Sequence, residues 1–332
     1  MKYLISFLFL ALAFSMKSEA KVTLPSILGD NMVLQQQAEV KLWGKARPNA
    51  TVTVKTSWNG QTYKFSSDGK GGWSLTVSTP VAGGPYKIIF NDGELLTLQN
   101  VLIGEVWFCS GQSNMEMPMG CFDRQPVRGA NDIIAKAKPS TPIRMYTTDS
   151  KDGRWVRQFS KTPAEDCQGE WLENTPVNVS HISAVSYYFA RYIQEVLEVP
   201  VGIVVSTWGG SRIEAWMSRE SIKPFSSIDL SILDNDAEVK NPPATPCVLY
   251  NGKIAPLTNF AVRGFLWYQG ESNRDNADLY QSLMPAFVAD LRAKWGRGEL
   301  PFYFVQIAPF DYEGADGTSA ARLREVQLQN MK

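Results

Sequence analysis

The sequence has few of the residues from which metal and nucleic-acid sites are built. Its 332 residues include one histidine, His181, and four scattered cysteines, which are too few for a His-rich metal site or a zinc ribbon. The 33 basic and 33 acidic residues cancel, so the net charge gives no attraction for nucleic acid or for an anionic membrane. No GxGxxG or GxxxxGK(S/T) motif follows an apolar run, so no phosphate-binding loop is predicted. We therefore expect neither a metal ion nor an organic cofactor.

Beyond residue 20 the chain lacks any apolar run long enough to cross a membrane. Before it, a lysine precedes the apolar stretch Tyr3–Phe14, and small residues occupy positions 18 and 20, where a signal peptidase reads. As a helix this stretch would rise only about 18 Å. We predict that residues 1–20 are a signal peptide, that the protein is secreted or periplasmic, and that it has no membrane contact after cleavage.

Export would permit disulfide bonds. The cysteines are Cys109, Cys121, Cys167 and Cys247, and they allow three complete pairings among which the sequence does not choose. Cys109 lies inside an apolar run, so we expect a buried free thiol there.

Residues 21–100 alternate short β-prone runs with turn residues. Apolar and polar residues alternate in Val40–Trp43, Thr51–Val54 and Trp73–Val77, and Asn59-Gly60 is a hairpin signal. The pattern predicts a small all-β sandwich domain. An exposed aromatic such as Trp58 could bind carbohydrate there, but the pattern favours a domain that packs beside a catalytic one.

Residues 101–332 show a different pattern, in which short apolar runs do not alternate. These runs are Val101–Cys109, Val201–Val205, Phe265–Tyr268 and Phe302–Val305. Strands of a parallel sheet lack alternation because both of their faces are covered. Helical patterns lie between the runs, so we predict an α/β domain with a parallel sheet.

Two of these helical patterns are long. Ala277–Trp295 is one of them, and Ser183–Leu197 is the other. The second places six apolar residues on one stripe, which is typical of an amphipathic helix: Val185, Tyr188, Phe189, Tyr192, Ile193 and Val196.

Polar segments containing glycine follow three of the predicted strands. They are Gly111–Met115, Gly209–Ser211 and Gln269–Asn273. Each alone is typical of a turn. Because ligands bind beyond the carboxyl ends of strands in an open α/β sheet, the three together predict a site with a serine hydroxyl, exposed backbone N–H groups and a side-chain amide. Acyl transfer needs this set.

The segments GEVWFCSGQSNMEMP, STWGGSRIEAWMS and FLWYQGESN resemble the blocks of the SGNH hydrolase superfamily. More narrowly, they resemble its sialate O-acetylesterase family of carbohydrate esterases. LPSILGDNMVLQQ and VKLWGKA are similar to the β-domain that precedes the hydrolase in that family. The resemblance implies a flavodoxin-like parallel sheet over residues 101–332, preceded by the β-sandwich.

The resemblance also implies roles for individual residues. Ser113 matches the nucleophile, and its backbone N–H and the side-chain amide of Asn273 match oxyanion-hole donors. A glycine of the GGS segment supplies a backbone N–H, and Gly210, deeper in the turn, is preferred over Gly209. Four further residues are expected either to orient these groups or to contact sugar hydroxyls, with a purely structural turn hydrogen bond as the equal alternative: Gln112, Asn114, Gln269 and Glu271.

The family's fourth block, a short Asp…His segment that carries the catalytic base, is not found in this sequence. His181 lies just before a predicted helix, where a histidine is ordinarily a solvated surface residue, and we do not expect it to act as the base. We expect that the esterase domain is incomplete at its C-terminal end. The alternative is a native short chain that acts as a weak enzyme or a sugar-binding pseudoenzyme. An incomplete sheet would leave the Phe302 strand as an apolar edge and make the chain poorly soluble.

The resemblance implies hydrolysis of O-acetyl esters on glycans, with O-acetylated sialic acid as the first candidate substrate. An acetylxylan-type esterase acting on plant polysaccharide and a non-catalytic glycan-binding protein are the alternatives. Specificity would come from residues 117–131, 151–174 and 225–248. Trp155 and Trp171 could stack on sugar rings or be packed in the core. The sequence leaves the oligomeric state open.

Overall fold

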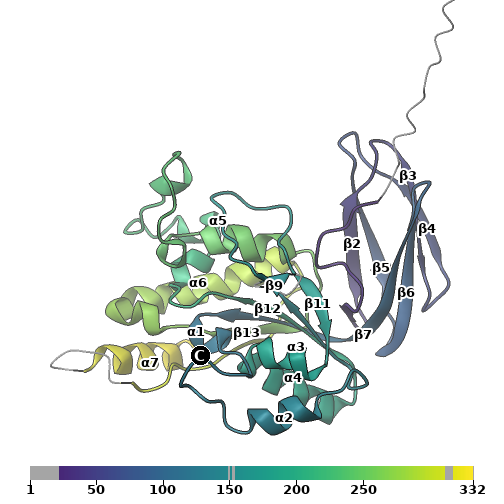
Figure 1. Ribbon diagram of the computed structural model, residues 1–332. Coiled ribbons are helices and arrows are strands. Elements are labelled where there is room, and N and C mark those ends of the chain that lie inside the picture. Colours follow the sequence, from purple (N-terminus) through teal and green to yellow (C-terminus); the bar gives the residue numbers. More distant parts are fainter. Residues whose placement is uncertain (1–21, 149, 152–153, 311–316, 332) are drawn as a thin grey trace, which may run out of the picture.

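The computed structural model describes residues 22–148, 150–151, 154–310 and 317–331. The predicted signal peptide therefore lies outside the described residues, and so does the side chain of Trp155. Figure 1 shows a group of upright strands beside a layered α/β part. Among the described residues, no helix is long and apolar enough to span a membrane.

Residues 22–112 contain strands and no helix in the part of the chain described. The alternation places Val40 and Leu42 in the core and leaves Lys41 exposed. β2 pairs with β5, β3 pairs with β4 and β6, and the two sheets share a core in which the rings of Trp73 and Phe90 are 5.7 Å apart. The strands are β1 (Val33–Gln35), β2 (Glu39–Lys45), β3 (Thr51–Thr56), β4 (Thr62–Ser66), β5 (Gly72–Ser78) and β6 (Gly83–Asn91).

Trp58 is part of this packing. It lies half-buried, its Nε1 donates to the carbonyl of Ser78 (3.1 Å), and its ring meets Tyr86 edge-on at 5.9 Å. These contacts favour the structural interpretation of Trp58 over a sugar platform.

One long strand, β7 (Leu95–Gly111), joins the two parts of the molecule. Its first half pairs antiparallel with β6, and residues 102–104 pair with β1. From Glu105 onward it lies between β12 and β13 of the central sheet. The domain boundary predicted after residue 100 therefore falls inside a continuous strand. The division into two domains stays a prediction.

The central sheet is mostly parallel, and its order is β11–β8–β12–β7–β13–β14. All four predicted apolar runs form strands in it: β7, β12 (Val201–Thr207), β13 (Gly264–Tyr268) and β14 (Phe302–Phe304). β8 (Ile143–Thr147), which is parallel, and β11 (Glu170–Glu173), which is antiparallel, lie beyond β12. The five parallel strands, numbered as they occur in the chain, stand in the order 2-3-1-4-5, which differs from the 2-1-3-4-5 order of flavodoxin. The sequence analysis missed β8 because Arg144 interrupts its apolar run. β9 (Ser150–Lys151) and β10 (Arg154–Trp155) form a separate two-residue pair.

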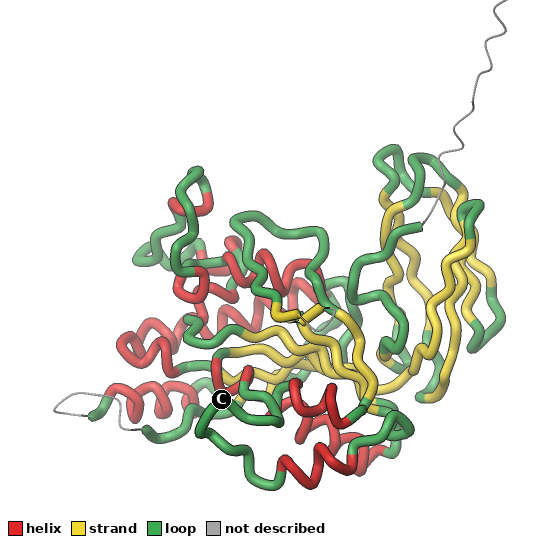
Figure 2. Tube along the Cα trace, viewed as in Figure 1, coloured by secondary structure: helices red, strands yellow, loops and turns green. Residues whose placement is uncertain are grey.

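Helices cover both faces of this sheet (Figure 2). Cys109 and Ile203 pack against Tyr187 of α4 on one face, whereas Phe265 and Trp267 lie in the core shared with α6 on the other. The helices are α1 (Ser113–Glu116), α2 (Ala130–Lys136), α3 (Pro176–His181), α4 (Ala184–Leu197), α5 (Arg219–Ile222), α6 (Ala277–Trp295) and α7 (Ser319–Gln329).

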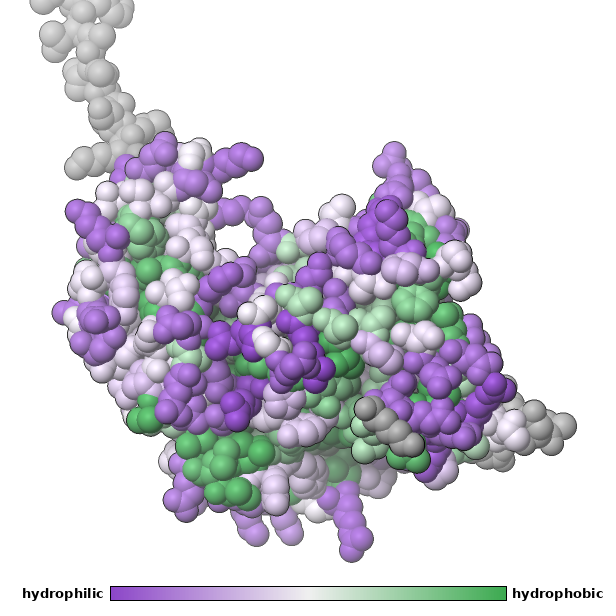
Figure 3. Space-filling view, turned by 180° about the vertical axis from the view of Figure 1, so that it is seen from behind, coloured by the Kyte–Doolittle hydropathy of each residue, from purple (hydrophilic) through white to green (hydrophobic). Residues whose placement is uncertain are grey.

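The apolar stripe of α4 packs only in part against the sheet, and three of its six residues are exposed. Tyr188, Tyr192 and Val196 are 36%, 66% and 59% exposed, and Val185, Phe189 and Ile193 are only partly buried. The buried residues are Ala184, Ser186, Tyr187 and Ala190. Figure 3, which views the molecule from behind, shows a continuous hydrophobic patch low on the surface. Figure 1 draws α4 at the same level.

The four cysteines, which all lie in the described part of the chain, form no disulfide bond, and Cys109, Cys167 and Cys247 are buried. The expectation for Cys109 is confirmed. Burial raises the pKa of its thiol to about 12, with a smaller opposing effect from a hydrogen bond to Ser186.

Candidate active site

The three polar segments start at one level of the sheet. Gly111 at the end of β7 pairs with Thr207 at the end of β12 on one side and with Tyr268 at the end of β13 on the other. The strands that follow β7 in the chain lie on both sides of it. The end of β7 is therefore the switch point, where open α/β sheets bind ligands. The predicted convergence of the segments therefore occurs in the structure.

A close approach between backbones makes Gly111 necessary. A Cβ atom at this position would lie 2.1 Å from the carbonyl oxygen of Tyr268. Gln112 continues the contact, since its N–H donates to the same oxygen (3.0 Å). The chain then turns into α1, whose first residue is Ser113.

Ser113 is partly buried, and its hydroxyl makes no hydrogen bond with any residue that the structure describes. Its backbone N–H begins α1, where the first N–H groups of a helix have no partner within the helix. His181 is exposed at the C-terminal end of α3 and makes no described contact with Ser113. A base for Ser113 is therefore not found among the described residues.

The Gly209-Gly210 turn lies beside Ser113. A Cβ atom built on Gly209 would be 3.7 Å from Cβ of Ser113. The N–H of Gly209 donates to Oε2 of Glu116. Gly210 has a φ of 73°, is exposed, and among the described residues its N–H meets no acceptor. The geometry therefore favours Gly210 over Gly209 as a donor to a bound oxyanion.

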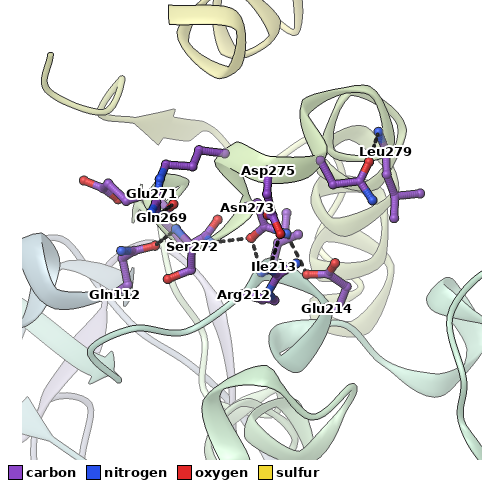
Figure 4. A network of polar contacts seen from close by, with 12 residues as sticks. Gln112, Arg212, Ile213, Glu214, Gln269, Glu271, Ser272, Asn273, Asp275 and Leu279 are labelled. Carbon is purple, nitrogen blue, oxygen red and sulfur yellow. Dashed lines mark hydrogen bonds and ion pairs between the residues drawn. The ribbon is translucent and has the colours of Figure 1, made fainter. Parts of the chain in front are cut away.

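The side chain of Asn273 is held in one orientation (Figure 4). Its Oδ1 accepts from the N–H of Ile213 (3.0 Å) and from Nε2 of Gln269 (2.7 Å), and its Nδ2 donates to Oε2 of Glu214 (2.8 Å). Two donors at one end and a carboxylate at the other identify which atom is nitrogen. The second hydrogen of Nδ2 has no acceptor among the residues described, and Asn273 is 1% exposed.

Gln112 and Gln269 are buried connectors between the segments. Oε1 of Gln112 accepts from the N–H groups of Gly270 (3.2 Å) and Ser272 (3.4 Å). Nε2 of Gln269 donates to the carbonyl of Ser211 (2.9 Å) as well as to Asn273. Both glutamines are 3% exposed or less, so these contacts favour an orienting role over contact with sugar.

Asn114 and Glu271 form a second link between the first and third segments. Nδ2 of Asn114 donates to Oε1 of Glu271 (2.6 Å). Glu271 is 6% exposed, and its Oε2 has no partner among the described residues. Burial raises the pKa of this carboxyl above its ordinary value, while a backbone hydrogen bond and Asn114 lower it in part. The bond from Asn114 therefore favours an orienting role for Glu271, since its second oxygen is also buried.

Sequence reasoning missed two carboxylates in this site. Glu116 lies three residues after Ser113, a spacing that puts both on one side of a helix and that could have been noticed. Glu214 orients Asn273, and it stands in the quoted segment STWGGSRIEAWMS. Arg157, which bonds to Glu116 (2.5 Å), comes from a distant segment that carries no motif.

Trp171, a candidate for stacking on sugar rings, does not contribute to this edge. Trp171 is buried, and its Nε1 donates to the carbonyl of Ile27 (2.8 Å), so it packs in the core. Within the described ranges, no group of three or more His, Cys, Asp or Glu side chains could hold a metal ion.

Residues 103–332 match the family model described as carbohydrate esterase, sialic acid-specific acetylesterase. The chain belongs to this family of carbohydrate esterases. It is 31% identical over 309 residues to the sialate O-acetylesterases of Homo sapiens and Pongo abelii. The solved structure of a carbohydrate acetylesterase from Xanthomonas citri matches with a TM-score of 0.81 and 34% identity.

The chain is shorter than these family members. The alignments cover 85% of this chain but 56% of each of the two mammalian esterases. The Xanthomonas citri structure is matched over 94% of this chain and 66% of that one. The family is therefore established, and the activity of this chain is a separate question.

Proposed function

We propose that this chain is a serine esterase unit that removes O-acetyl groups from glycans through an acetyl-enzyme on Ser113. The observation that carries the proposal is that Ser113, Gly210 and Asn273 lie on the three segments that follow the ends of adjacent parallel strands, with the Gly209-Gly210 turn beside Ser113. The hydroxyl of Ser113 attacks the acetyl carbonyl. The N–H of Gly210 and Nδ2 of Asn273 donate to the oxyanion, and the sugar hydroxyl leaves with a proton. Water then releases acetate and restores the serine.

This reaction needs a proton acceptor near Ser113, and we propose that it comes from outside the described residues. The bare hydroxyl of Ser113 and the exposed position of His181 support this. Without a base a serine attacks slowly, and only the oxyanion hole and substrate binding contribute to the rate. We also propose that residues 21–100 form a separate sandwich domain that packs beside the esterase unit.

O-acetylated sialic acid is the proposed substrate, because the human and Pongo abelii relatives are named sialate O-acetylesterases. The broader name of the Xanthomonas citri protein, carbohydrate acetylesterase, keeps other acetylated glycans such as xylan as the alternative. Acetate release from O-acetylated sialic acid and from acetylated xylan, measured side by side, distinguishes the two.

The proposal is tested by the hydrolysis of an aryl acetate by the full chain. Ser113→Ala should abolish the enzymatic rate, and Asn273→Ala should lower it by about 100-fold, which is typical of one oxyanion donor. Ser57→Ala, in the turn between β3 and β4, is the matched control and should leave the rate unchanged. A Ser113→Ala protein as active as the wild type would refute the nucleophile assignment.

A non-catalytic glycan-binding protein is the second candidate, favoured by the missing base. In that case the chain binds an acetylated sugar in a calorimetric titration but releases no acetate above the Ser113→Ala background. We propose further that the protein is secreted or periplasmic. N-terminal sequencing of exported protein that begins at Lys21 would support this, and an intact Met1 would contradict it.

A further inference from the structure

We propose that Glu116 is a positioning residue that holds the Gly209-Gly210 turn against the nucleophile helix and so assigns the oxyanion contact to Gly210. The inference rests on the proposed function. Glu116 itself does not touch substrate.

The first observation is where its carboxylate lies. Glu116 belongs to the same short helix as Ser113, and its side chain is 7% exposed. Its Oε2 accepts the N–H of Gly209, which is 93 residues away in the sequence. A Cβ atom on Gly209 would be 3.3 Å from this oxygen and 3.7 Å from Cβ of Ser113. The carboxylate therefore connects the turn directly to the helix that carries the nucleophile.

The second observation is that the carboxylate is held from its other side. Oε1 of Glu116 bonds to Nη2 of Arg157 (2.5 Å), and the guanidinium of Arg157 lies 4.8 Å from the ring centre of Trp208. Trp208 directly precedes the turn, and its N–H donates to the carbonyl of Gly111 (3.1 Å). Nζ of Lys253 also lies 5.6 Å from this ring. The two oxygens of Glu116 are therefore held by different partners, one by the N–H of Gly209 and the other by Arg157.

The consequence concerns two adjacent glycines. The N–H of Gly209 is occupied by Glu116 and cannot serve an oxyanion, whereas the N–H of Gly210 is left unoccupied within the described residues. A Gly-Gly pair is the most flexible dipeptide available, and a displacement of about 1 Å in a catalytic group can lower the rate by about 100-fold. The hydrogen bond from Gly209 removes that freedom.

Amide hydrogen exchange tests the contact without needing turnover. The full chain is labelled with 15N-glycine, and the two resonances are assigned by their loss in Gly209→Ala and Gly210→Ala. We expect the Gly209 amide to exchange at least about tenfold more slowly than that of Gly210. Glu116→Ala should remove this protection, and Glu116→Asp, whose shorter side chain draws the carboxylate back, should do the same. Glu116→Gln keeps an acceptor oxygen and should preserve it.

An internal control separates local release from unfolding. The N–H of Gly296 caps α6 by donating to the backbone carbonyl of Arg292 (3.0 Å). Its exchange rate should be the same in all variants. Arg157→Gln should leave Gly209 protected, because the acceptor remains. Unchanged Gly209 exchange in both Glu116→Ala and Glu116→Asp would overturn the inference.

The kinetic measurement asks whether the contact matters for the reaction. With an aryl acetate, Glu116→Ala should lower kcat by about 100-fold with little change in KM, and Glu116→Gln should restore most of kcat. An equal loss in Glu116→Gln would show that the ion pair with Arg157 matters, not the turn, and would refute the positioning role. If the rate does not depend on Ser113, the proposed function fails, and the exchange data alone decide on Glu116.

Discussion

At Ser113 the structure combines donors for an oxyanion with a hydroxyl that has no hydrogen-bond partner in the described part of the chain. Stabilising the charge that develops on the carbonyl oxygen and removing the serine proton are separate requirements. We propose that Gly210 and Asn273 supply the first of these. No acceptor for the serine proton is found among the described residues, so a small base added to the solution can be used to test the division.

Imidazole should increase hydrolysis of an aryl acetate by this chain. General-base assistance contributes about 100-fold or more when well placed, and a diffusing base should recover about a tenth of that. Initial rates are measured at increasing imidazole concentration. Because imidazole also attacks aryl acetates directly, Ser113→Ala in the same buffer gives the background. Equal increases in both proteins would mean that Ser113 is not the nucleophile or that a base is already present.

A buried carboxyl gives the second residue-scale prediction, at Glu271. Since burial raises its pKa, the folded state binds the proton more tightly than the unfolded state. The free energy of unfolding should therefore fall as pH rises from the ordinary carboxyl pKa to the raised one. Glu271→Gln cannot ionise and keeps an oxygen for Asn114, so its excess stability over the wild type should grow over that range.

Urea unfolding of both proteins from about pH 5 to about pH 8 measures this difference. Glu220 is the control, because the hydrogen bond from Lys294 is the main cause that lowers its pKa and it stays ionised in this range. The stability difference for Glu220→Gln should be constant. A constant difference for Glu271→Gln would contradict the raised pKa.

Among the elements, α4 shows why an apolar stripe is an unreliable guide to the buried face. The helix begins where expected, since Ser183 caps it by accepting from the N–H of Ser186 (3.2 Å). Its periodicity was also correct. The side that contacts the sheet, however, is the one that allows the closest approach, and Ala184 and Ala190 are buried there.

Two substitutions in α4 test this assignment. Ala190→Leu should lower the free energy of unfolding by about 1–3 kcal/mol, because there is no room for a larger side chain against the sheet. Tyr192→Gln should change it by no more than about 0.5 kcal/mol, because that residue faces solvent. Urea unfolding measures both. The reverse ranking would place the stripe against the sheet after all.

At the scale of the whole molecule, the sheet has an apolar edge at β14, which pairs only with β13 in the described residues. Tyr303 and Val305 are 54% and 38% exposed. A groove of about 660 Å³ lies against this edge, between α6 and the end of α7, and Met284, Phe302 and Leu328 line it. An uncovered apolar edge is a template for pairing with another chain.

We therefore expect the chain to self-associate as its concentration rises. The double variant Tyr303→Lys with Val305→Lys should lower the association, because charged edge residues prevent strand pairing. Light scattering coupled to size-exclusion chromatography measures it. Val81→Lys, at a 63% exposed apolar residue after β5, is the matched control and should have no effect. A chain that stays monomeric at all concentrations would show that this edge is protected.

Local patterns in the sequence determined the central strands and the two long helices of this protein. The four apolar runs became β7, β12, β13 and β14, and α6 spans the predicted residues Ala277–Trp295. The glycine-containing segments were placed at strand ends for the same reason, since burial and turn chemistry act within a few residues. The prediction that the segments meet followed from the general geometry of parallel sheets.

Only the tertiary structure decided which atoms of these segments touch. Glu116 meets Gly209 across 93 residues, and Asn114 meets Glu271 across 157. Such contacts depend on strand order and register, which no local pattern encodes. The hydrogen bond that occupies the N–H of Gly209, the orientation of Asn273, and the buried face of α4 all followed from that packing, because a hydrogen bond or a close approach exists only once both partners are in place.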